Sequence, residues 1–516
     1  MRVFWPSTTI PEPMTSQTGA VGRSPVVRVA TSDGEQVVTA AREASDSVPV
    51  VRTGPTGIAA SDPLVAATDG GRTAFFEAAP HSTARSVAAS LADDEFPADD
   101  ADAVVEHDPG VETLSAPDAG PLSVGRRAVL GPCGWVDPLS PDDLPPASAE
   151  RSAEAAADAG LLGRGRGDAA ADEPVGDAWA TARETAGDPV VVVNANDAHD
   201  EQRADRTLLW GAPMAVLDGM AGVAEHVGAE DAVLYLNEAD GDLFRHLAAA
   251  VDAAAGELPV VPQLVAGPDE HRAGAPTAAL EALEGADRIE PRLQPPSPAE
   301  QGLYGRPTVV HTPRTYAQVR RAMADPDAFD PGAADPGTRV LTVAGDVAAP
   351  ATVELPSSAT LSAVRDAVDV EGSFKMACVG DVLGGYARDL DVTATAASLR
   401  AAGLGTEGVV EVLNDGRCAL ADAGDRAGFA ASENSGRCVP GREGTKQLTE
   451  LLRDVYEGSF EDDKIRELGR VMRRSSNCDT GAHAPRPVTT AIEAFEPEVR
   501  AHADGRCPAG TCRGDL

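Results

Sequence analysis

Apolar runs alternate with amphipathic stretches through the middle of the chain, and this alternation predicts strands followed by helices. The run 188–197 holds four consecutive valines between turn-forming residues, which is typical of a short strand buried in a parallel sheet. The same patterns predict helices over 148–163, 208–227 and 241–255, and strands over 232–238 and 258–265. This order favours an α/β protein with a parallel, Rossmann-like sheet in residues 150–335 and ligands beyond the carboxyl ends of its strands.

Shorter patterns on either side predict further units. Residues 26–95 contain strand patterns and a hairpin, which indicates a small α/β unit. Residues 336–420 fit a hairpin followed by a helix, and residues 424–502 fit a bundle of helices with apolar residues at i, i+3 and i+4. The acidic stretch 96–120 is poor in large apolar residues, so we expect it to be a linker.

A Pro- and Gly-rich stretch, 285–308, follows the central strands and helices. Its five prolines fix φ and remove backbone donors, so it is neither a helix nor a central strand. It still holds Leu293, Leu303 and Tyr304, apolar side chains that a free linker would not need. A binding or structural loop fits these residues, and a packed crossover between two domains fits them equally well.

The chain is strongly acidic. Its 516 residues carry 82 acidic side chains against 43 lysines and arginines, a net charge of −39, and only three of the cations are lysines. This composition resembles that of proteins from extreme halophiles, in which molar salt screens the self-repulsion. It argues against nucleic acid as a partner, because phosphate contacts need a basic face.

The sequence also indicates in which cellular compartment the protein is expected. It has no run of 18 apolar residues, so we expect no membrane span, and its start lacks the apolar core of a signal peptide. We therefore expect residues 1–25 to form a disordered extension of a cytoplasmic protein. Seven scattered cysteines are too few for a disulfide framework, which fits a reducing compartment.

Two motifs in the middle of the chain point to a known family. TAALEALEG (277–285) and PRLQPPSPAEQGLYGRPTVV (291–310) resemble the NADH-binding flavoprotein subunit, the 51-kDa or F subunit, of respiratory complex I and of NAD-reducing hydrogenases. The resemblance covers nearly the whole chain, residues 26–502. It implies hydride transfer from NADH to FMN, release of single electrons through a [4Fe–4S] cluster, and other redox subunits as partners.

The resemblance also assigns a domain to each part of the chain. It implies a thioredoxin-like domain without cluster cysteines (26–95), an acidic linker and lead-in (96–149), an FMN/NADH-binding-like domain (150–335), a soluble-ligand-binding β-grasp domain (336–420), a helical iron–sulfur-binding-like domain (424–502) and a Cys-containing tail (503–516). Fold transfers more safely than function between relatives, because function depends on individual side chains.

The flavin site that the resemblance implies is partly present. Its expected cofactor-binding residues are Gly163, Arg164, Gly165, Asn194, Asp197, Gly274 and Thr315. A glycine-rich loop such as 163–167 lets backbone N–H groups approach a phosphate, although taken alone a GRGRG run is more typical of a plain turn. Ala178 stands where the family has a lysine, and we expect Arg164 to supply that positive charge.

The positions implied to bind NADH carry different residues. Glu173 and Ser297 stand where the family has aromatic residues, and Gln294 stands where it has a lysine. The loss of two stacking rings and a cation removes much of the recognition of a dinucleotide. We therefore expect NADH to reduce the protein poorly.

The iron–sulfur loop is incomplete. SENSGRCVPGREG (432–444) resembles the family's cluster loop, but Ser435 and Gly441 replace two of its cysteines, which leaves Cys438 and Cys478 as remnant metal ligands. Two thiolates cannot form a conventional four-thiolate site, so a [4Fe–4S] cluster is not expected. Residues 26–95 contain no cysteine, so we expect no [2Fe–2S] cluster there either.

Further candidate ligands lie towards the C-terminus. His483, Cys507 and Cys512 could complete a metal site, and CPAGTC (507–512) is a conceivable metal loop. A frayed tail with free thiols is the alternative.

Two functions remain open from these residues. One is a divergent flavoprotein oxidoreductase subunit that still binds flavin or an altered nucleotide. The other is a redox-inactive pseudoenzyme, a scaffold that binds a partner protein or a nucleotide.

Overall fold

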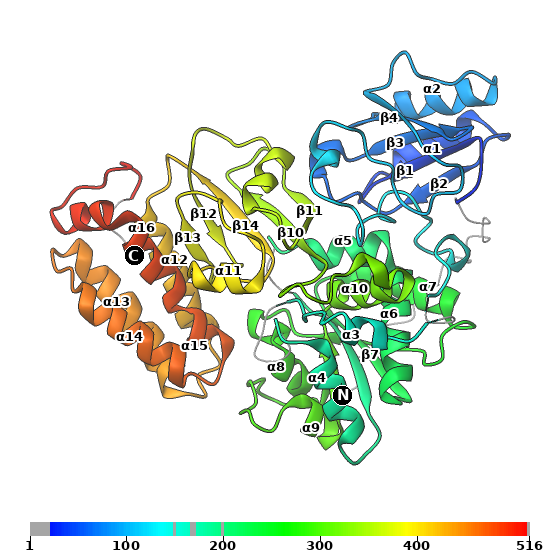
Figure 1. Ribbon diagram of the computed structural model, residues 1–516. Helices are drawn as coiled ribbons and strands as arrows, with labels where there is room; N and C mark the ends of the chain where they lie inside the picture. Colours follow the sequence, from blue (N-terminus) through cyan, green and yellow to red (C-terminus); the bar gives the residue numbers. More distant parts are fainter. Residues whose placement is uncertain (1–20, 148–150, 166–171, 198–200, 513–516) are drawn as a thin grey trace.

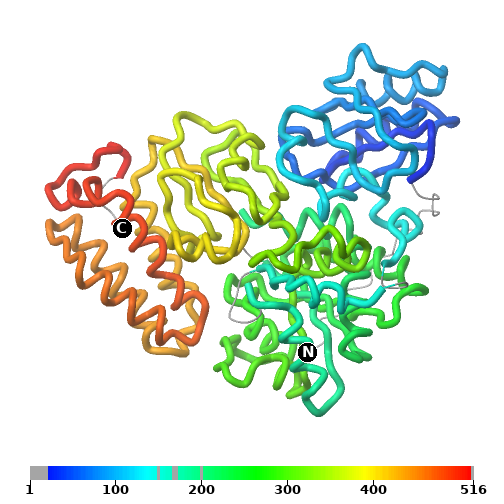
Figure 2. Tube along the Cα trace, in the orientation of Figure 1, coloured from blue at the N-terminus to red at the C-terminus, as the bar shows by residue number. Residues whose placement is uncertain are grey.

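The computed structural model describes residues 21–147, 151–165, 172–197 and 201–512. They form three β-sheets with their helices and a C-terminal group of helices (Figure 1). The third sheet in sequence lies between the helical group and the rest, and Figure 2 follows the chain through these parts. The protein is therefore of mixed α/β class, as the sequence predicts.

The first sheet has the strand order β2-β1-β3-β4-β5, with β1 and β2 parallel and the other pairs antiparallel. Its elements are β1 (Val26–Ala30), α1 (Glu35–Ala44), β2 (Val50–Thr53), β3 (Leu64–Asp69), β4 (Arg72–Phe76), α2 (His81–Ala92) and β5 (Ala103–Glu106). The predicted hairpin is confirmed as β3 and β4. The linker expected over 96–120 is partly wrong, because Val104 and its neighbours pair with β4 as an edge strand.

The second sheet is parallel throughout, in the order β8-β7-β6-β9, as the alternation of strands and helices predicts. Its strands are β6 (Val190–Ala195), β7 (Asp231–Asn237), β8 (Gln263–Gly267) and β9 (Thr308–His311). The strand expected over 258–265 begins only at Gln263. Pro259 and Pro262 explain the difference, because proline has no N–H to give to a neighbouring strand.

Alternate valines of β6 serve the two faces of this sheet. Val191 and Val193 pack with the helices α3 to α7 and α10, whereas Val190 and Val192 pack with α8 (Pro276–Leu283) and Leu303. The remaining bounds are α3 (Glu154–Asp158), α4 (Val175–Glu184), α5 (Ala204–Gly211), α6 (Pro213–Val227), α7 (Gly241–Ala254), η4 (His271–Gly274) and α10 (Pro313–Ala324). Helices therefore cover both faces of the parallel strands, which leaves the strand ends as the place for a ligand.

Two predicted helices differ from those observed. The helix expected over 208–227 is two helices, α5 and α6, bent by 98° at Pro213, which starts α6 and has no N–H to continue α5. The helix expected over 148–163 shrinks to α3. Gly160 follows it with φ +69°, a left-handed conformation that ends a helix readily.

The third sheet is mixed, in the order β11-β10-β14-β12-β13, with β10 and β14 parallel and the other pairs antiparallel. Its elements are β10 (Thr338–Gly345), β11 (Ala351–Pro356), η7 (Leu361–Ala367), β12 (Phe374–Val379), β13 (Gly385–Ala387), α11 (Ala396–Ala401) and β14 (Val409–Asn414). The hairpin expected at the start of 336–420 is confirmed as β10 and β11.

The C-terminal helices form a bundle whose predicted amphipathic members are all present. They are α12 (Ala419–Glu433), α13 (Thr445–Tyr456), α14 (Asp462–Ser475), α15 (Asp479–His483) and α16 (Pro485–Ala503). The bundle starts at Ala419 rather than at residue 424. Cys418 is the residue that precedes the first turn of α12.

The Pro-rich stretch 285–308 runs from α8 to β9 and so crosses over within one sheet, not between two domains. It contains two short helices, α9 (Pro298–Gln301) and η5 (Leu303–Gly305). Leu303 enters the core, whereas Leu293 and Tyr304 are 53% and 69% exposed. Arg292 holds the stretch in place by donating to Glu281 and to the carbonyl of Gly302. These contacts support the structural interpretation, and a binding role for the stretch stays a prediction.

The described part of the N-terminal segment is not free, because the N–H of Val21 donates to Asp143 Oδ1 at 3.1 Å. Residues 1–20 of the expected extension lie outside the described residues. Within the described ranges, no single helix has the length and apolar character needed to cross a membrane; α5 and α6 meet that test only when they are joined across their bend.

Candidate functional site

The residues expected to bind flavin gather at the carboxyl ends of β6 and β9. Asn194, near the end of β6, donates from Nδ2 to the carbonyl of Gly274 at 2.9 Å. Thr315, in the first turn of the helix after β9, accepts a hydrogen bond from the N–H of Arg164 at 2.8 Å. Since β6 and β9 are neighbours in the sheet, the two pairs share one edge of it.

Gly165 is held against the start of α10. A Cβ on this residue would lie 2.4 Å from Thr312 Cγ2, and its φ is +133°, so only glycine fits here. Thr312 Oγ1 also donates to the carbonyl of Arg164 at 2.7 Å. The glycine loop therefore makes a close backbone approach to the end of β9; its residues 166 and 167 lie outside the described part of the chain.

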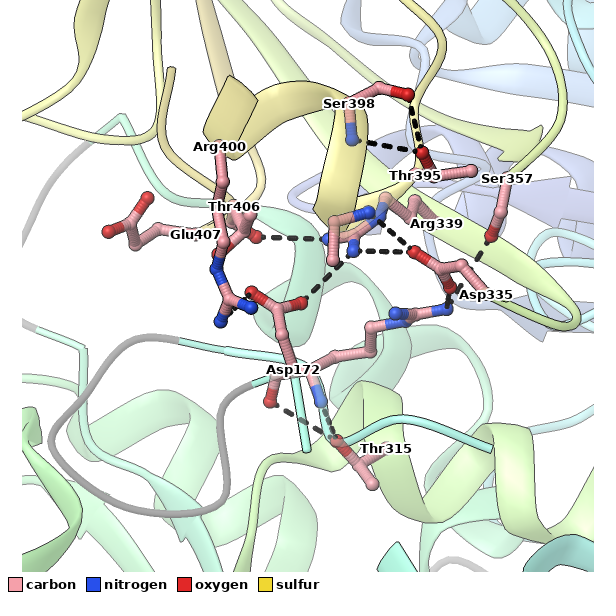
Figure 3. Close-up of polar contacts among 12 residues, drawn as sticks. Asp172, Thr315, Asp335, Arg339, Ser357, Thr395, Ser398, Arg400, Thr406 and Glu407 are labelled. Carbon is pink, nitrogen blue, oxygen red and sulfur yellow. Dashed lines mark hydrogen bonds and ion pairs between the residues drawn. The ribbon is translucent and has the colours of Figure 1, made fainter. Parts of the chain in front are cut away.

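The side chain of Arg164 joins a buried ion-pair network. The other members of this network, Asp335, Arg339 and Asp172, are labelled in Figure 3. The guanidinium of Arg164 donates to Asp335 at 2.5 Å, and Asp335 also accepts from Arg339 at 2.8 Å. Arg339 continues to Asp172 at 3.0 Å. All four side chains are almost fully buried. The expectation that Arg164 supplies positive charge to a cofactor phosphate is therefore wrong, because its guanidinium is already paired with the carboxylate of Asp335.

This network connects Arg164 and Asp172, the residues on either side of segment 165–171, to the third sheet. Arg164 comes just before segment 165–171 and Asp172 comes just after it. Asp335 precedes β10, and Arg339 lies within β10. Burial opposes ionisation of Asp335, but the adjacent Arg164 and Arg339 outweigh it and hold the pKa of this carboxyl below its usual value. Burial, followed by repulsion from Arg339, lowers the pKa of Arg164 to about 10, so it stays charged at neutral pH.

The N-terminus of α10 is also occupied. Arg314 donates its backbone N–H to Asp205 Oδ1 at 2.9 Å, and its guanidinium pairs with the same carboxylate. Pro313, the first residue of the helix, has no N–H. The helix start therefore lends little to a phosphate. In the glycine loop, the N–H of Gly163 donates to the carbonyl of Glu173 and that of Arg164 to Thr315, so these two donors are also used within the chain.

One oxygen at this edge lacks a partner. Among the described residues, no hydrogen-bond donor reaches Asn194 Oδ1, although Asn194 is only 5% exposed. Leaving a buried acceptor unpaired costs about 1–3 kcal/mol. The residues present therefore fit a polar ligand that brings a donor to this oxygen, as the ribityl hydroxyls and the ring N–H of FMN do.

Asp197, two residues beyond β6, lies apart from this group. It lines a cavity of about 1060 Å³ between the first two units, together with Asn237, Asp269 and residues of α5 and α7. Pro55 and Ala59 of the first unit also line this cavity. No sequence pattern indicates this cavity, because its walls come from six separate segments: 32–33, 52–62, 197–210, 237–246, 269 and 350–352.

The four positions of the expected cluster loop do converge at one end of the helical bundle. A Cβ on Gly441 would lie 3.0 Å from Cys438 Sγ and 3.2 Å from Cys478 Sγ. Ser435 is 3% exposed and lines a small pocket with Cys478. The fold has therefore kept the arrangement of the loop while two of its four thiols are replaced.

The donors present do not fit a [4Fe–4S] cluster. Cys438 Sγ accepts from the N–H groups of Gly441 and Asn477, and Cys478 Sγ accepts from that of Gly481. The small pocket of about 10 Å³ beside Ser435 and Cys478 is also lined by His271, Arg272 and Pro291 of the unit that contains the parallel sheet. Two thiolates leave this loop short of the four ligands that a conventional cluster takes.

The expectation that His483, Cys507 and Cys512 act together is wrong. His483 lies beside Asp479 at 2.8 Å, next to the cluster loop. Cys507 and Cys512 lie at the other end of the bundle, beside Cys418 and His502. Sequence reasoning missed Cys418 and His502, because Cys418 is distant in sequence and His502 fits the pattern of an amphipathic helix.

Comparison with known proteins agrees with this architecture. Residues 156–321 match the family model of the Nuo51 FMN-binding domain, and residues 423–502 match that of the NADH-ubiquinone oxidoreductase-F iron-sulfur binding region. The F subunit of the NADH-quinone oxidoreductase of Streptomyces coelicolor is 30% identical over 383 residues, 68% of this chain and 83% of that one. The HndC subunit of the NADP-reducing hydrogenase of Solidesulfovibrio fructosivorans is 28% identical over 423 residues, 74% of this chain and 84% of that one.

A solved NAD⁺-reducing [NiFe]-hydrogenase in the air-oxidized state has the same fold, with a TM-score of 0.64 at 24% identity over 95% of this chain and 86% of that one. Fold, matched regions and relatives define a flavoprotein-type electron-transfer subunit. The chain belongs to the family of the NADH-binding flavoprotein subunit, the F or 51-kDa subunit, of NADH-quinone oxidoreductases and related hydrogenases.

Proposed function

We propose that this chain is the flavin-carrying subunit of a larger redox complex and binds FMN at the carboxyl edge of β6 and β9. The backbone of Gly165, with Asn194 and Thr315, would hold the cofactor, while the backbone of Gly163 pairs with Asp172 and Glu173 and shapes the loop. FMN supplies an acceptor for two electrons that it can release one at a time. The residues of the chain bind and orient that group and keep water from it.

Asn194 is the observation that carries this proposal. Its Nδ2 is fixed by the carbonyl of Gly274, so its buried Oδ1 points in a set direction and has no partner among the described residues. Gly165 packs against Thr312 with no space for a side chain, which brings backbone rather than side chain to the same edge. A flat polar ligand with hydroxyl and N–H donors matches both features.

The finer assignments of the parts of the chain belong to the same proposal. The parallel sheet with its helices is the FMN/NADH-binding-like domain, and the sheet that contains β10 is the β-grasp domain. The first sheet is a thioredoxin-like domain, now extended by β5. We place the subunit in the cytoplasm of an organism with high internal salt, because its charge of −39 needs screening.

A second function is favoured by the loop end of the bundle. Because Ser435 and Gly441 stand in place of two thiols, we expect no electrons to leave through a [4Fe–4S] cluster there. A scaffold that assembles with redox partners, without turnover of its own, would keep the fold and lose these donors. The multi-subunit relatives support partner subunits for either function.

Titration calorimetry with FMN in molar salt tests the flavin proposal. We expect wild type to bind with a dissociation constant in the micromolar range, roughly −8 kcal/mol. Gly165→Asp should abolish binding, because it puts a carboxylate and a clashing side chain beside the phosphate. Asn194→Ala should weaken binding about tenfold, since one hydrogen bond is lost.

Gly256→Asp is the matched control. Gly256 lies in the same domain and has no positive φ, and a Cβ added to it would meet no atom within 4 Å, so this variant should bind FMN like wild type. Equal binding by wild type and Gly165→Asp, or no binding by wild type, would reject this edge as a flavin site and favour the scaffold.

A further inference from the structure

A second group of cysteines lies at the end of the bundle that the family resemblance does not concern. The sulfur atoms of Cys418, Cys507 and Cys512 and the imidazole of His502 offer four ligand atoms that all lie within 4.8 Å of one another. His502 Nε2 is 3.3 Å from Cys418 Sγ and 3.1 Å from Cys512 Sγ. We propose that these four side chains bind one Zn²⁺ ion as a closed Cys₃His site.

Three segments of the chain bring the ligands together. Cys418 precedes the first turn of α12, and His502 lies in the last turn of α16. After α16, Gly505 takes φ +75°, and its N–H donates to the carbonyl of His502 at 2.9 Å while that of Arg506 donates to Ala501 at 2.9 Å. This pair of bonds is a Schellman motif, which reverses the chain and returns the tail to the end of the helix.

The tail then turns a second time between its two cysteines. Gly510 has φ +70°, and its N–H donates to the carbonyl of Cys507 at 3.1 Å. The two turns place Cys507 and Cys512 on the same side, facing His502. A frayed tail would not hold two half-buried thiols against a buried histidine, so the local geometry favours a defined site.

The imidazole is oriented as a metal ligand. His502 Nδ1 lies 2.8 Å from the carbonyl oxygen of Glu498, and since a carbonyl only accepts, Nδ1 carries the proton. Nε2 is then the unprotonated nitrogen, and it faces the thiols. A backbone carbonyl behind the far nitrogen is the arrangement that usually fixes the tautomer of a metal-bound histidine.

The ligand distances select a single ion. Bonds of about 2.3 Å to sulfur and 2.0–2.1 Å to nitrogen in a tetrahedron separate ligand atoms by about 3.5–3.8 Å. The observed distances of 3.1 and 3.3 Å need shifts of only a few tenths of an ångström. In a [4Fe–4S] cluster each thiolate binds a different iron, so its sulfurs are spread more widely. Three thiolates and one imidazole with no open position are typical of structural zinc.

Binding exchanges protons for the ion: the three thiols lose one proton each as three Zn–S bonds form, the neutral imidazole adds a Zn–N bond, and no electron is transferred. The cysteines belong to an apolar cluster that includes Ala503, Ala509 and Phe460, and the hydroxyl of Tyr456 hydrogen-bonds with Cys512. The site would tie the tail to the start of α12 and the end of α16, away from the cluster loop at the other end of α16.

Metal analysis of the purified full-length chain tests the site. We expect about one zinc per chain in wild type and a loss of nearly all of it in Cys507→Ser/Cys512→Ser. The matched control is Cys438→Ser/Cys478→Ser, which removes two cysteines of the same bundle and should keep the zinc. Both thiols of the tail are only partly buried and lie outside the helices, so their removal should leave the helical circular dichroism unchanged.

Cobalt(II) exchanged into the zinc site gives a second readout. We expect the visible bands of a tetrahedral thiolate complex in wild type and in Cys438→Ser/Cys478→Ser, and their absence in Cys507→Ser/Cys512→Ser. Zinc retained by the tail variant, iron and sulfide in place of zinc, or a Cys507–Cys512 disulfide in protein purified without oxygen would each overturn the proposal.

Discussion

The family's functional positions converge at two places, the carboxyl edge of the parallel sheet and the loop end of the helical bundle. The two places differ in which functional groups remain. At the sheet edge, Gly165, Asn194 and Thr315 remain, and Asn194 still offers an oxygen without a partner among the described residues. At the bundle end, Cys438 and Cys478 remain, but Ser435 and Gly441 give no thiolates and backbone N–H groups satisfy the two sulfurs.

The difference shows how the two kinds of site tolerate change. A flavin edge is built largely from backbone, so it survives substitution of many side chains. A four-thiolate cluster needs every ligand, so two substitutions are enough to remove it. The same fold can therefore keep one cofactor site and lose the other.

The largest effect is expected from restoring the missing thiols. Ser435→Cys/Gly441→Cys supplies four cysteines at positions that already converge, so anaerobic reconstitution should raise bound iron from near zero to about four per chain, with matching sulfide. Ser432→Cys/Gly428→Cys makes the same changes on α12 away from the loop and should bind none. A broad charge-transfer band with about four irons in wild type would break the comparison.

The buried ion pairs behind the glycine loop should give the next largest effect. Asp335→Asn leaves Arg164 and Arg339 buried with less compensation, so we expect a loss of about 3–5 kcal/mol in the free energy of unfolding. Asp325→Asn removes an exposed partner of Arg321 and should cost well under 1 kcal/mol. Urea denaturation in molar salt measures both; equal losses would show that the network does not anchor the loop.

Reduction by NADH should separate flavin binding from turnover. With FMN loaded, stopped-flow mixing with NADH should bleach the flavin about 100-fold more slowly than dithionite does, because two stacking rings and a cation are missing. Glu173→Phe/Ser297→Phe should speed the reaction with NADH about tenfold by returning two aromatic contacts. Rapid bleaching of wild type at micromolar NADH would mean that other residues recognise the dinucleotide.

A smaller effect is expected from pH at the end of β9. His311 accepts from Trp179 Nε1–H at 3.0 Å, and burial lowers its pKa to about 4 from 6.5. Between these values the unfolded chain binds more protons, so stability falls as pH falls. From pH 6.5 to about pH 5, His311 should contribute a loss of about 2 kcal/mol.

His311→Gln keeps an acceptor for Trp179 and should flatten part of this pH dependence in thermal unfolding at fixed salt. Burial also lowers the pKa of His246 to about 4, so some of the slope will remain. If His311→Gln leaves the slope of stability against pH unchanged, other residues cause this pH dependence.

The sequence by itself determined most of the element types. Four consecutive valines make both faces of β6 apolar, and a short apolar run of this kind is typical of a strand buried in a parallel sheet. Period-two and period-3.6 patterns likewise predicted the hairpins and the helices α13, α14 and α16. Helix boundaries that depend on single residues were harder to predict from the sequence. At Pro213, for example, the chain bends by 98° instead of continuing one helix.

The sequence also named the residues of the sheet edge and the cluster loop, because motif order along the chain carries them. It could not say where the charge of Arg164 goes, since Asp335 lies 171 positions away and only packing makes them partners. It could not pair Cys418 with Cys512 either. Ligand sets and ion pairs depend on distances of a few ångströms between segments remote in sequence, and only the tertiary structure brings those segments together.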